Sequence, residues 1–262
     1  MESLHSKRNR FFWRLRSALG FRRAGYKEAG DTSLPLTDEE KRLERRYGLV
    51  FLRPRLAPET YRKNLATLWV MEKTLPPELL PKGSFNVLEP GCQDFSRLPA
   101  IRAFFKRHGR EPKVTGLELD PYPVLSNFHS RADKAEYYLS LGGRQSSDLF
   151  QAGDFFKWSR PAELVLSFYP FVSKDPALAW GIPEDFGDGA KWADAFVRIL
   201  QPGGLVLVVH QGPWEEEEFD RARKGKPLEI LWRSRVDCPF YPLPHPACAS
   251  VYRRGGRQGL SH

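Results

Sequence analysis

The sequence predicts an α/β fold, in which a doubly wound, mostly parallel seven-stranded sheet ends in an antiparallel edge pair and follows an N-terminal helical extension. Three observations lead to this fold. Five short apolar segments with strand character alternate with segments of helical periodicity between residues 85 and 210. Acids or glycine turns follow several of these strands, and two extended segments close the chain, which predicts a pair at the sheet edge.

Length and composition favour one sizeable domain with extensions, since the 262 residues are 41% hydrophobic and 28% charged. The longest aliphatic run, Leu205 to Val209, is too short to cross a bilayer, and the N-terminus lacks the apolar stretch of a secretory signal. We therefore expect a cytoplasmic location, with peripheral membrane contact left open. The three cysteines have no CxxC spacing, so neither disulfides nor a metal site are expected.

The formal net charge of +9 is concentrated at the two ends of the chain. Residues 1–28 carry eight Lys and Arg against two acids, and Arg253, Arg254 and Arg257 add three more, whereas acids and bases balance in the remainder. This distribution predicts a terminal segment that touches something anionic, and it does not favour nucleic acid as a partner of the main domain.

Residues 1–58 are expected to form a basic arm and a short helical extension before a main domain at 59–254 and a tail at 255–262. Within the arm, residues 8–23 mix arginines with Phe, Trp and Leu at helical spacing. Four interpretations of such a segment are open: it is a mobile arm, it docks on its own domain, it lies on an anionic membrane surface, or it binds nucleic acid. A capping box at Thr37–Glu40 starts a short helix, and residues 59–74 form a longer one that packs on the sheet or roofs its cleft.

The first strand-helix-strand unit runs from Phe85 to Asp120. Its first strand ends at Glu89 before a turn at Gly91, and its second ends in Glu118 and Asp120. Backbone N–H groups at such a turn face a ligand, and the second acid can accept hydrogen bonds from ribose hydroxyls. The pattern is typical of the nucleoside-binding half of a doubly wound sheet.

The later elements follow in alternation. We expect a helix at 123–141, a strand at 150–152, a strand at 162–168, a long functional loop to about 189, a helix at 191–200, a tight turn at 201–204, a strand at 205–210, a helix from 214, and extended segments at 229–236 and 247–254.

Four short motifs in this order resemble those of the class I S-adenosylmethionine-dependent methyltransferases. They are VLEPGC at 87–92, GLELDP at 116–121, GDF at 153–155 and RILQPGGLVLVV at 198–209. The resemblance covers roughly residues 60–254 and implies that family's fold and S-adenosylmethionine as cofactor.

The resemblance also implies roles for single residues. It places Glu89 and the turn of Gly91 and Cys92 at the methionine end of the cofactor, and Glu118, with Leu119 beside it, at the ribose hydroxyls. Asp154 would accept from the adenine amino group, with Phe155 beside the ring. The FYPF run puts Phe168 in the cofactor site and Tyr169 and Phe171 toward the methyl group. Alternatively, Glu118 and Asp154 are solvated strand ends.

The first motif departs from the family pattern, because Gly91 is followed by Cys92, Gln93 and Asp94 instead of a second glycine. A left-handed backbone at Gln93 would cost about 1–2 kcal/mol and weaken a site without abolishing it. FYPF lacks the polar residue and first proline of amino-methylating relatives, which argues against adenine methylation. His210, at the end of the fifth strand, is the candidate general base, with Tyr169 as a second catalytic candidate and a structural histidine as the alternative.

Three functions remain open at this point. The leading hypothesis is an S-adenosylmethionine-dependent methyltransferase acting on a small-molecule, lipid-linked or membrane-associated acceptor. The second is a catalytically inactive methyltransferase-like scaffold, and the third is an RNA methyltransferase with a basic arm. Cofactor binding separates the first two, and salt-dependent RNA binding would indicate the third. The sequence does not define the oligomeric state.

Overall fold

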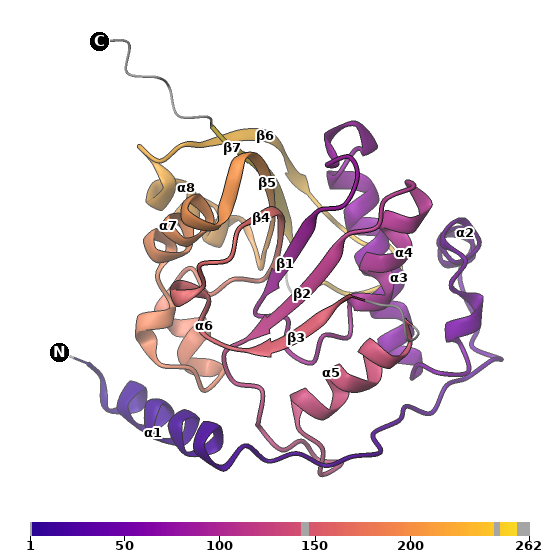
Figure 1. The fold of residues 1–262 in the computed structure, drawn as a ribbon, viewed down its shortest axis with the longest axis horizontal. Coiled ribbons are helices and arrows are strands. Elements are labelled where there is room, and N and C mark those ends of the chain that lie inside the picture. Colours follow the sequence, from indigo (N-terminus) through magenta and orange to yellow (C-terminus); the bar gives the residue numbers. More distant parts are fainter. Residues whose placement is uncertain (1, 143–146, 244–246, 256–262) are drawn as a thin grey trace.

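A seven-stranded sheet is the centre of the computed structural model, which describes residues 2–142, 147–243 and 247–255. The strands are β1 (Asn86–Pro90), β2 (Lys113–Glu118), β3 (Leu149–Ala152), β4 (Ala162–Phe168), β5 (Leu200–His210), β6 (Leu228–Arg235) and β7 (Cys248–Arg254). Their spatial order is β3-β2-β1-β4-β5-β7-β6, with β1 to β5 parallel and β7 antiparallel to both of its neighbours (Figure 1). The predicted fold class is confirmed.

Helices cover both faces of this sheet. They are α1 (Leu4–Leu19), α2 (Asp38–Tyr47), α3 (Pro58–Thr74), α4 (Leu98–Arg107), α5 (Arg131–Ser140), α6 (Lys174–Ala179), α7 (Gly189–Ile199) and α8 (Pro213–Arg223), with short 3-10 turns η1 (Leu49–Leu52), η2 (Pro77–Leu79), η3 (Phe155–Lys157) and η4 (Glu184–Phe186). One buried cluster joins the sheet to α3, α4 and α5, and the other joins it to α7 and α8. The layers are therefore those of a doubly wound fold.

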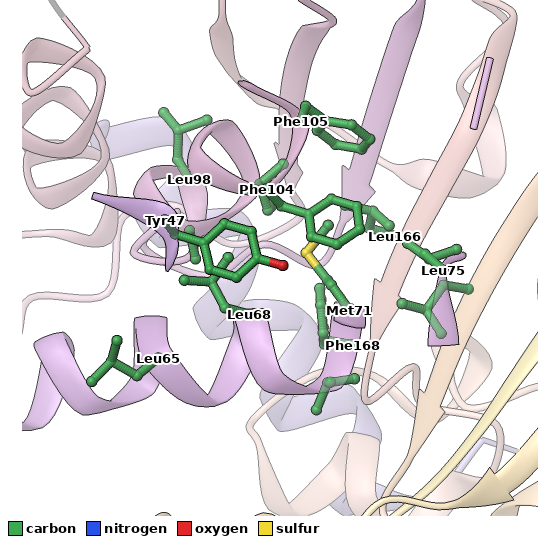
Figure 2. Packing of buried hydrophobic residues seen from close by; sticks show 14 of the residues in the cluster. Tyr47, Leu65, Leu68, Met71, Leu75, Leu98, Phe104, Phe105, Leu166 and Phe168 are labelled. Atoms are coloured by element: carbon green, nitrogen blue, oxygen red, sulfur yellow. The ribbon is translucent and has the colours of Figure 1, made fainter. Parts of the chain in front are cut away.

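Successive residues of the central strands belong to opposite clusters. Leu164 and Leu166 of β4 pack in the cluster of α3 and α4, whereas Val165 packs in the cluster of α7. Figure 2 shows part of the first cluster, in which Met71 of α3 and Phe104 of α4 lie near Leu166. Because both faces are buried, these strands read as continuous apolar runs in the sequence.

The helix expected at 123–141 begins eight residues later, so that prediction is corrected. Residues 121–130 form a loop, with an isolated bridge between Val124 and Ser130, and α5 starts at Arg131. Two prolines oppose helix at the start of this segment, while Ser130 and Asp133 form a reciprocal capping box that fixes the helix start. The fifth strand, in contrast, starts earlier than the expected residue 205, at Leu200.

The N-terminal arm docks on its own domain. Its helix α1 lies beside α6 at the edge of the molecule, and the chain then runs past α5 toward α2 (Figure 1). Leu43 and Leu52, from the following extension, are buried in the same cluster as α3 and α4. Residues 256–262 of the expected tail lie outside the described part of the chain.

Two further observations limit the architecture within the described residues. None of the helices there is long and apolar enough to cross a membrane. No group of three or more histidine, cysteine, aspartate or glutamate side chains is arranged there to hold a metal ion.

Candidate cofactor and acceptor cavities

The loop after β1 is held in an unusual backbone conformation. Gly91, Gln93 and Phe95 all have positive φ, at 67°, 57° and 61°. Two non-glycine residues in this region cost about 1–2 kcal/mol each, which the surroundings must offset. Part of that compensation is visible, because Gly91 N–H donates to the Leu117 carbonyl oxygen at 2.8 Å and the Phe95 ring is fully buried.

Gly116 of β2 makes room for this loop. A Cβ atom at Gly116 would lie 2.7 Å from the Phe95 ring and 2.9 Å from the Cys92 sulfur. Cys92 is therefore fully buried behind the loop, where burial raises the pKa of its thiol well above the ordinary value. The resemblance had placed Cys92 against the cofactor, and the structure instead uses it to pack the loop onto β2.

Glu118, at the end of β2, ties the loop to the strand. Its Oε2 accepts from Gln93 N–H at 2.8 Å, and its Oε1 accepts from Asp120 N–H at 3.1 Å and from Arg131 at 3.2 Å. The side chain is only 5% exposed, and burial raises its pKa although Arg131 opposes that rise. Glu118 is thus a buried and liganded carboxylate, in contrast to the solvated strand end that was the alternative.

A cavity of about 740 Å³, counting its mouth, lies beside this loop at the carboxyl ends of the parallel strands. This is the edge at which open α/β sheets bind ligands. Eight of the residues that the sequence placed in the site line it: Gly91, Glu118, Leu119, Asp154, Phe155, Phe168, Tyr169 and Phe171. The structure thus brings residues of three of the four motifs and of the FYPF run to one cavity.

The far wall of this first cavity is aromatic. Asp154, after β3, accepts from Phe156 N–H through one carboxylate oxygen, while the other lies 3.8 Å from Lys157. Phe155 packs 4.9 Å from the Trp192 ring, and Phe156 stacks on Phe186 at 5.7 Å. A carboxylate can accept a hydrogen bond from the amino group of a purine base. The neighbouring aromatic rings can stack on the face of the same base.

Glu89 and His210 line neither this cavity nor the second one described below. Glu89 is 1% exposed, with Oε1 3.5 Å from Arg97, and burial raises its pKa to about 7. His210, the expected general base, is fully buried against the Phe219 ring, and burial lowers its pKa to about 3. The catalytic assignment of His210 is therefore corrected to a structural one, since His210 reaches neither cavity.

A second cavity, of about 1050 Å³ counting its mouth, adjoins the first. Lys63, Thr67 and Val70 of α3 line one side of it, and Tyr241 and Leu243 line another. The two cavities have five residues in common: Gln93, Phe168, Tyr169, Phe171 and Trp180. A molecule in one cavity would thus face a molecule in the other across this shared wall.

Tyr169 is the most constrained part of the shared wall. It has φ 58°, and its N–H donates to the Val209 carbonyl oxygen at 2.7 Å. Burial raises the pKa of its phenol to about 12, so the hydroxyl is protonated at neutral pH. The Arg97 guanidinium lies 4.7 Å from the Phe168 ring centroid and 5.9 Å from that of Tyr169.

The segment between β4 and α7 closes the first cavity, and helix α1 packs against residues that line it. The Trp13 indole N–H donates to the Leu119 carbonyl oxygen at 3.0 Å, and its ring lies 5.6 Å from Phe186. Arg16 pairs with Asp120. Trp13 and Arg16 were not found from the sequence, because α1 carries no motif and its docked face is identified only by tertiary contacts. Arg131 was not found because it begins α5, whose start was expected eight residues earlier.

Comparisons with known proteins place this geometry in a structural class. Neither a family model nor a curated protein matches the chain. A geranyl diphosphate C-methyltransferase from Streptomyces coelicolor A3(2) superposes with a TM-score of 0.53 over 96% of this chain and 98% of its own, at 10% sequence identity. The chain has the class I S-adenosylmethionine-dependent methyltransferase fold.

Two other structures agree on this methyltransferase fold, each with a TM-score of 0.50. A putative class I S-adenosylmethionine-dependent methyltransferase from Listeria monocytogenes matches at 13% identity over 84% of this chain and 69% of its own. A methyltransferase from Clostridium acetobutylicum matches at 11% identity over 74% of this chain and 92% of its own. At these identities the likeness is one of fold.

Proposed function

We propose that this chain is an S-adenosylmethionine-dependent methyltransferase whose first cavity binds the cofactor and whose second cavity binds a small-molecule or lipid-linked acceptor. The observation that carries the proposal is the shared wall of the two cavities. A methyl donor and an acceptor must meet across a short gap in line, and two adjoining cavities provide that arrangement.

The residues of the first cavity fit this cofactor. A carboxylate has about four acceptor positions, and Glu118 uses three of them, so one remains for a ribose hydroxyl and a second becomes free if Arg131 is displaced. Asp154 and the rings of Phe155 and Phe156 suit adenine. The geranyl diphosphate C-methyltransferase of the same fold was solved with S-adenosylhomocysteine bound, which supports the same cofactor here.

The cofactor would supply an electrophilic methyl group, and the chain would bind, orient and desolvate the reactants. Tyr169 and Gln93 border both cavities and are therefore placed to align the two molecules. Lys63 lies in the second cavity, where burial lowers the pKa of its amine to about 8, so it is partly neutral near physiological pH and able to accept a proton.

The second cavity suits an acceptor with an apolar body and a polar end. Its lining combines Ala66, Val70 and Leu243 with the cations of Lys63 and Arg97. Lipid-linked acceptors belong to the same proposal, because an open apolar cavity can hold part of a lipid chain.

Calorimetric titration with S-adenosylmethionine and S-adenosylhomocysteine tests the proposal. We expect micromolar binding by the wild type and a loss of at least about tenfold in Glu118→Ala, since a hydrogen bond to a charged group contributes roughly 1.5–3 kcal/mol. Glu229→Ala, an exposed acid of the edge strand β6, is the matched control and should bind as the wild type.

Absence of binding at millimolar cofactor by a folded wild type would overturn the enzyme proposal. It would leave the scaffold hypothesis, with the left-handed Gln93 at the shared wall as the structural reason. Binding that is equal in the wild type and Glu118→Ala would keep the cofactor and reject the ribose assignment.

A further inference from the structure

Helix α1 has its polar and apolar faces reversed relative to an ordinary docked helix. A helix that packs on its own domain normally buries its apolar stripe. In α1, the side that faces the domain carries Ser6, Asn9, Arg10, Trp13 and Arg16, and the apolar side chains face solvent.

The inner face is attached mainly through hydrogen bonds. The Asn9 side-chain amide donates to the carbonyl oxygens of Leu178 and Ile182, both at 3.1 Å. Arg10 pairs with Asp185 at 2.8 Å. These specific contacts fix the rotation of the helix, so the outward face is a defined surface of the folded protein.

The outward face carries an apolar stripe in which one cation, Arg8, lies between Leu4 and Phe12. Leu4, Phe11, Leu15 and Leu19 are spaced seven and four residues apart and therefore lie on one side of the helix. Phe11 is 62% exposed, Leu15 42% and Leu19 71%, and Phe12 extends the stripe with its ring 5.4 Å from that of Phe11. Solvent exposure of a stripe of this kind marks an interaction surface.

Cations accompany this stripe, and no acid does. The sequence of α1 contains no aspartate or glutamate. Arg10 and Arg16 are paired on the inner side, whereas Lys7, Arg8 and Arg14 form no ion pair within the residues that the structure describes. The surface thus combines exposed Phe and Leu with unneutralised positive charge.

This chemistry points to one occupant. A second copy of the chain related by two-fold symmetry would bring the same three cations toward their equivalents, which repel. RNA would neutralise the cations and leave the stripe of leucine and phenylalanine in water. An anionic lipid surface satisfies both, because headgroups attract the cations and the acyl boundary buries the apolar side chains.

We propose that the outward face of α1 docks on an anionic lipid membrane, with the helix lying in the plane of the interface. The chain continues the surface beyond the helix, since Phe21 is exposed and the Arg23 carbonyl oxygen lies 3.3 Å from His129 in the next loop. That loop also exposes the apolar side chains of Val124 and Phe128.

Co-sedimentation of the full chain with vesicles tests the proposal. We expect binding to phosphatidylcholine vesicles that contain phosphatidylserine and at least about tenfold weaker binding to pure phosphatidylcholine, because each cation near the surface contributes roughly a fivefold gain. Salt should weaken this binding by screening. Hydrogen exchange of the wild type should show the outward side of α1 protected by the anionic vesicles.

Two variants separate the apolar and charged contributions. Phe11→Ser with Leu15→Ser and Leu19→Ser removes the stripe, and Lys7→Gln with Arg8→Gln and Arg14→Gln removes the charge. Each should weaken anionic-vesicle binding by at least about thirtyfold. Controls of the same chemistry on exposed sites elsewhere, Val50→Ser with Phe51→Ser and Lys82→Gln with Lys106→Gln and Arg107→Gln, should bind as the wild type.

Three results would overturn the proposal. Equal binding to neutral and anionic vesicles would remove the charge argument, and absence of binding by the wild type would remove the site. A stripe variant that converts a dimer to a monomer, or a charge variant that abolishes RNA binding without changing vesicle binding, would assign the face to another occupant. Circular dichroism of each variant verifies the fold. Hydrogen exchange of the wild type tests the docking face without depending on the folding of any variant.

Discussion

The indole N–H of Trp13 donates to the carbonyl oxygen of Leu119 at 3.0 Å. This bond joins the N-terminal helix to the residue that follows Glu118, the carboxylate that lines the first cavity. The same indole packs edge-on against Phe186, which also lines that cavity. Trp13 therefore connects the end of β2 to the segment that closes the site.

Removing Trp13 should loosen that closure. We expect Trp13→Ala to weaken cofactor binding by about tenfold, because a hydrogen bond contributes roughly 1 kcal/mol and the lost ring contact adds to it. Calorimetry measures the affinity, and limited proteolysis should cut residues 1–30 faster. Phe12→Ala, the adjacent aromatic on the outward face, is the control and should leave cofactor affinity unchanged without vesicles. Equal affinity in Trp13→Ala would contradict a role in closure.

The two left-handed residues of the loop after β1 should respond in opposite ways to glycine. Gln93→Gly removes backbone strain and should raise the free energy of unfolding by about 1 kcal/mol. Phe95→Gly relieves the same strain but deletes a fully buried ring, and should lower stability by about 3 kcal/mol or more. Urea unfolding measures both. A loss of stability in Gln93→Gly would show that the Gln93 side chain is needed.

The sequence predicted the sheet and part of the first cavity because both depend on local patterns. Apolar runs ending in Glu118 or at Gly153-Asp154 mark strands whose carboxyl ends meet at one edge, so eight residues that line the first cavity were found without tertiary information. The start of α5 was missed although Ser130 and Asp133 carry a capping-box pattern, because the apolar periodicity upstream was given more weight than two prolines.

The second cavity and the orientation of the docked helix were beyond sequence reasoning. Lys63 lies on a helix that was expected to pack on the sheet or roof its cleft, but which of its side chains enter a cavity depends on the rotation of α3. The sequence shows that residues 8–23 mix arginines with apolar side chains at helical spacing, and only tertiary contacts such as those of Asn9 and Trp13 show that the stripe of Phe11, Leu15 and Leu19 faces outward. Likewise, the burial of His210 beneath α8 could not be read from its position at a strand end.

His210 should make the fold sensitive to acid. Its pKa is lowered to about 3 in the folded state, against about 6.5 unfolded, so the unfolded state binds the proton first as the pH falls. Stability from this residue is complete above pH 6.5 and is lost toward pH 3. Between pH 7 and 5 the loss should be about 2 kcal/mol.

Comparison with His210→Leu isolates this contribution. Glu89 and Glu215 have pKa values raised to about 7, so they act in the opposite sense. Their contribution to the stability of the fold is lost as the pH rises from 4.5 to 7. Both remain in the variant and cancel in the difference. Urea unfolding at pH 5 and pH 7 should show that the free energy of unfolding of the wild type, relative to that of His210→Leu, falls by about 2 kcal/mol between pH 7 and pH 5, with cofactor binding unchanged. The same pH dependence in both proteins would reject the buried neutral histidine.

Lys63 should titrate well below the pKa of an ordinary lysine. Burial, with Arg97 adding to it, lowers the pKa of its amine to about 8, so about half of it is neutral at pH 8, against a few parts per thousand of an ordinary lysine. Acetylation mapped by mass spectrometry should therefore show a rate for Lys63 that levels off above about pH 8. An ordinary exposed lysine shows a rate that rises until about pH 10. A Lys63 profile that also rises to pH 10 would mean that the amine stays charged, and it would remove Lys63 as the proton acceptor of the second cavity. A midpoint near 8 would place a neutral amine where the acceptor of a methyl group must lose its proton.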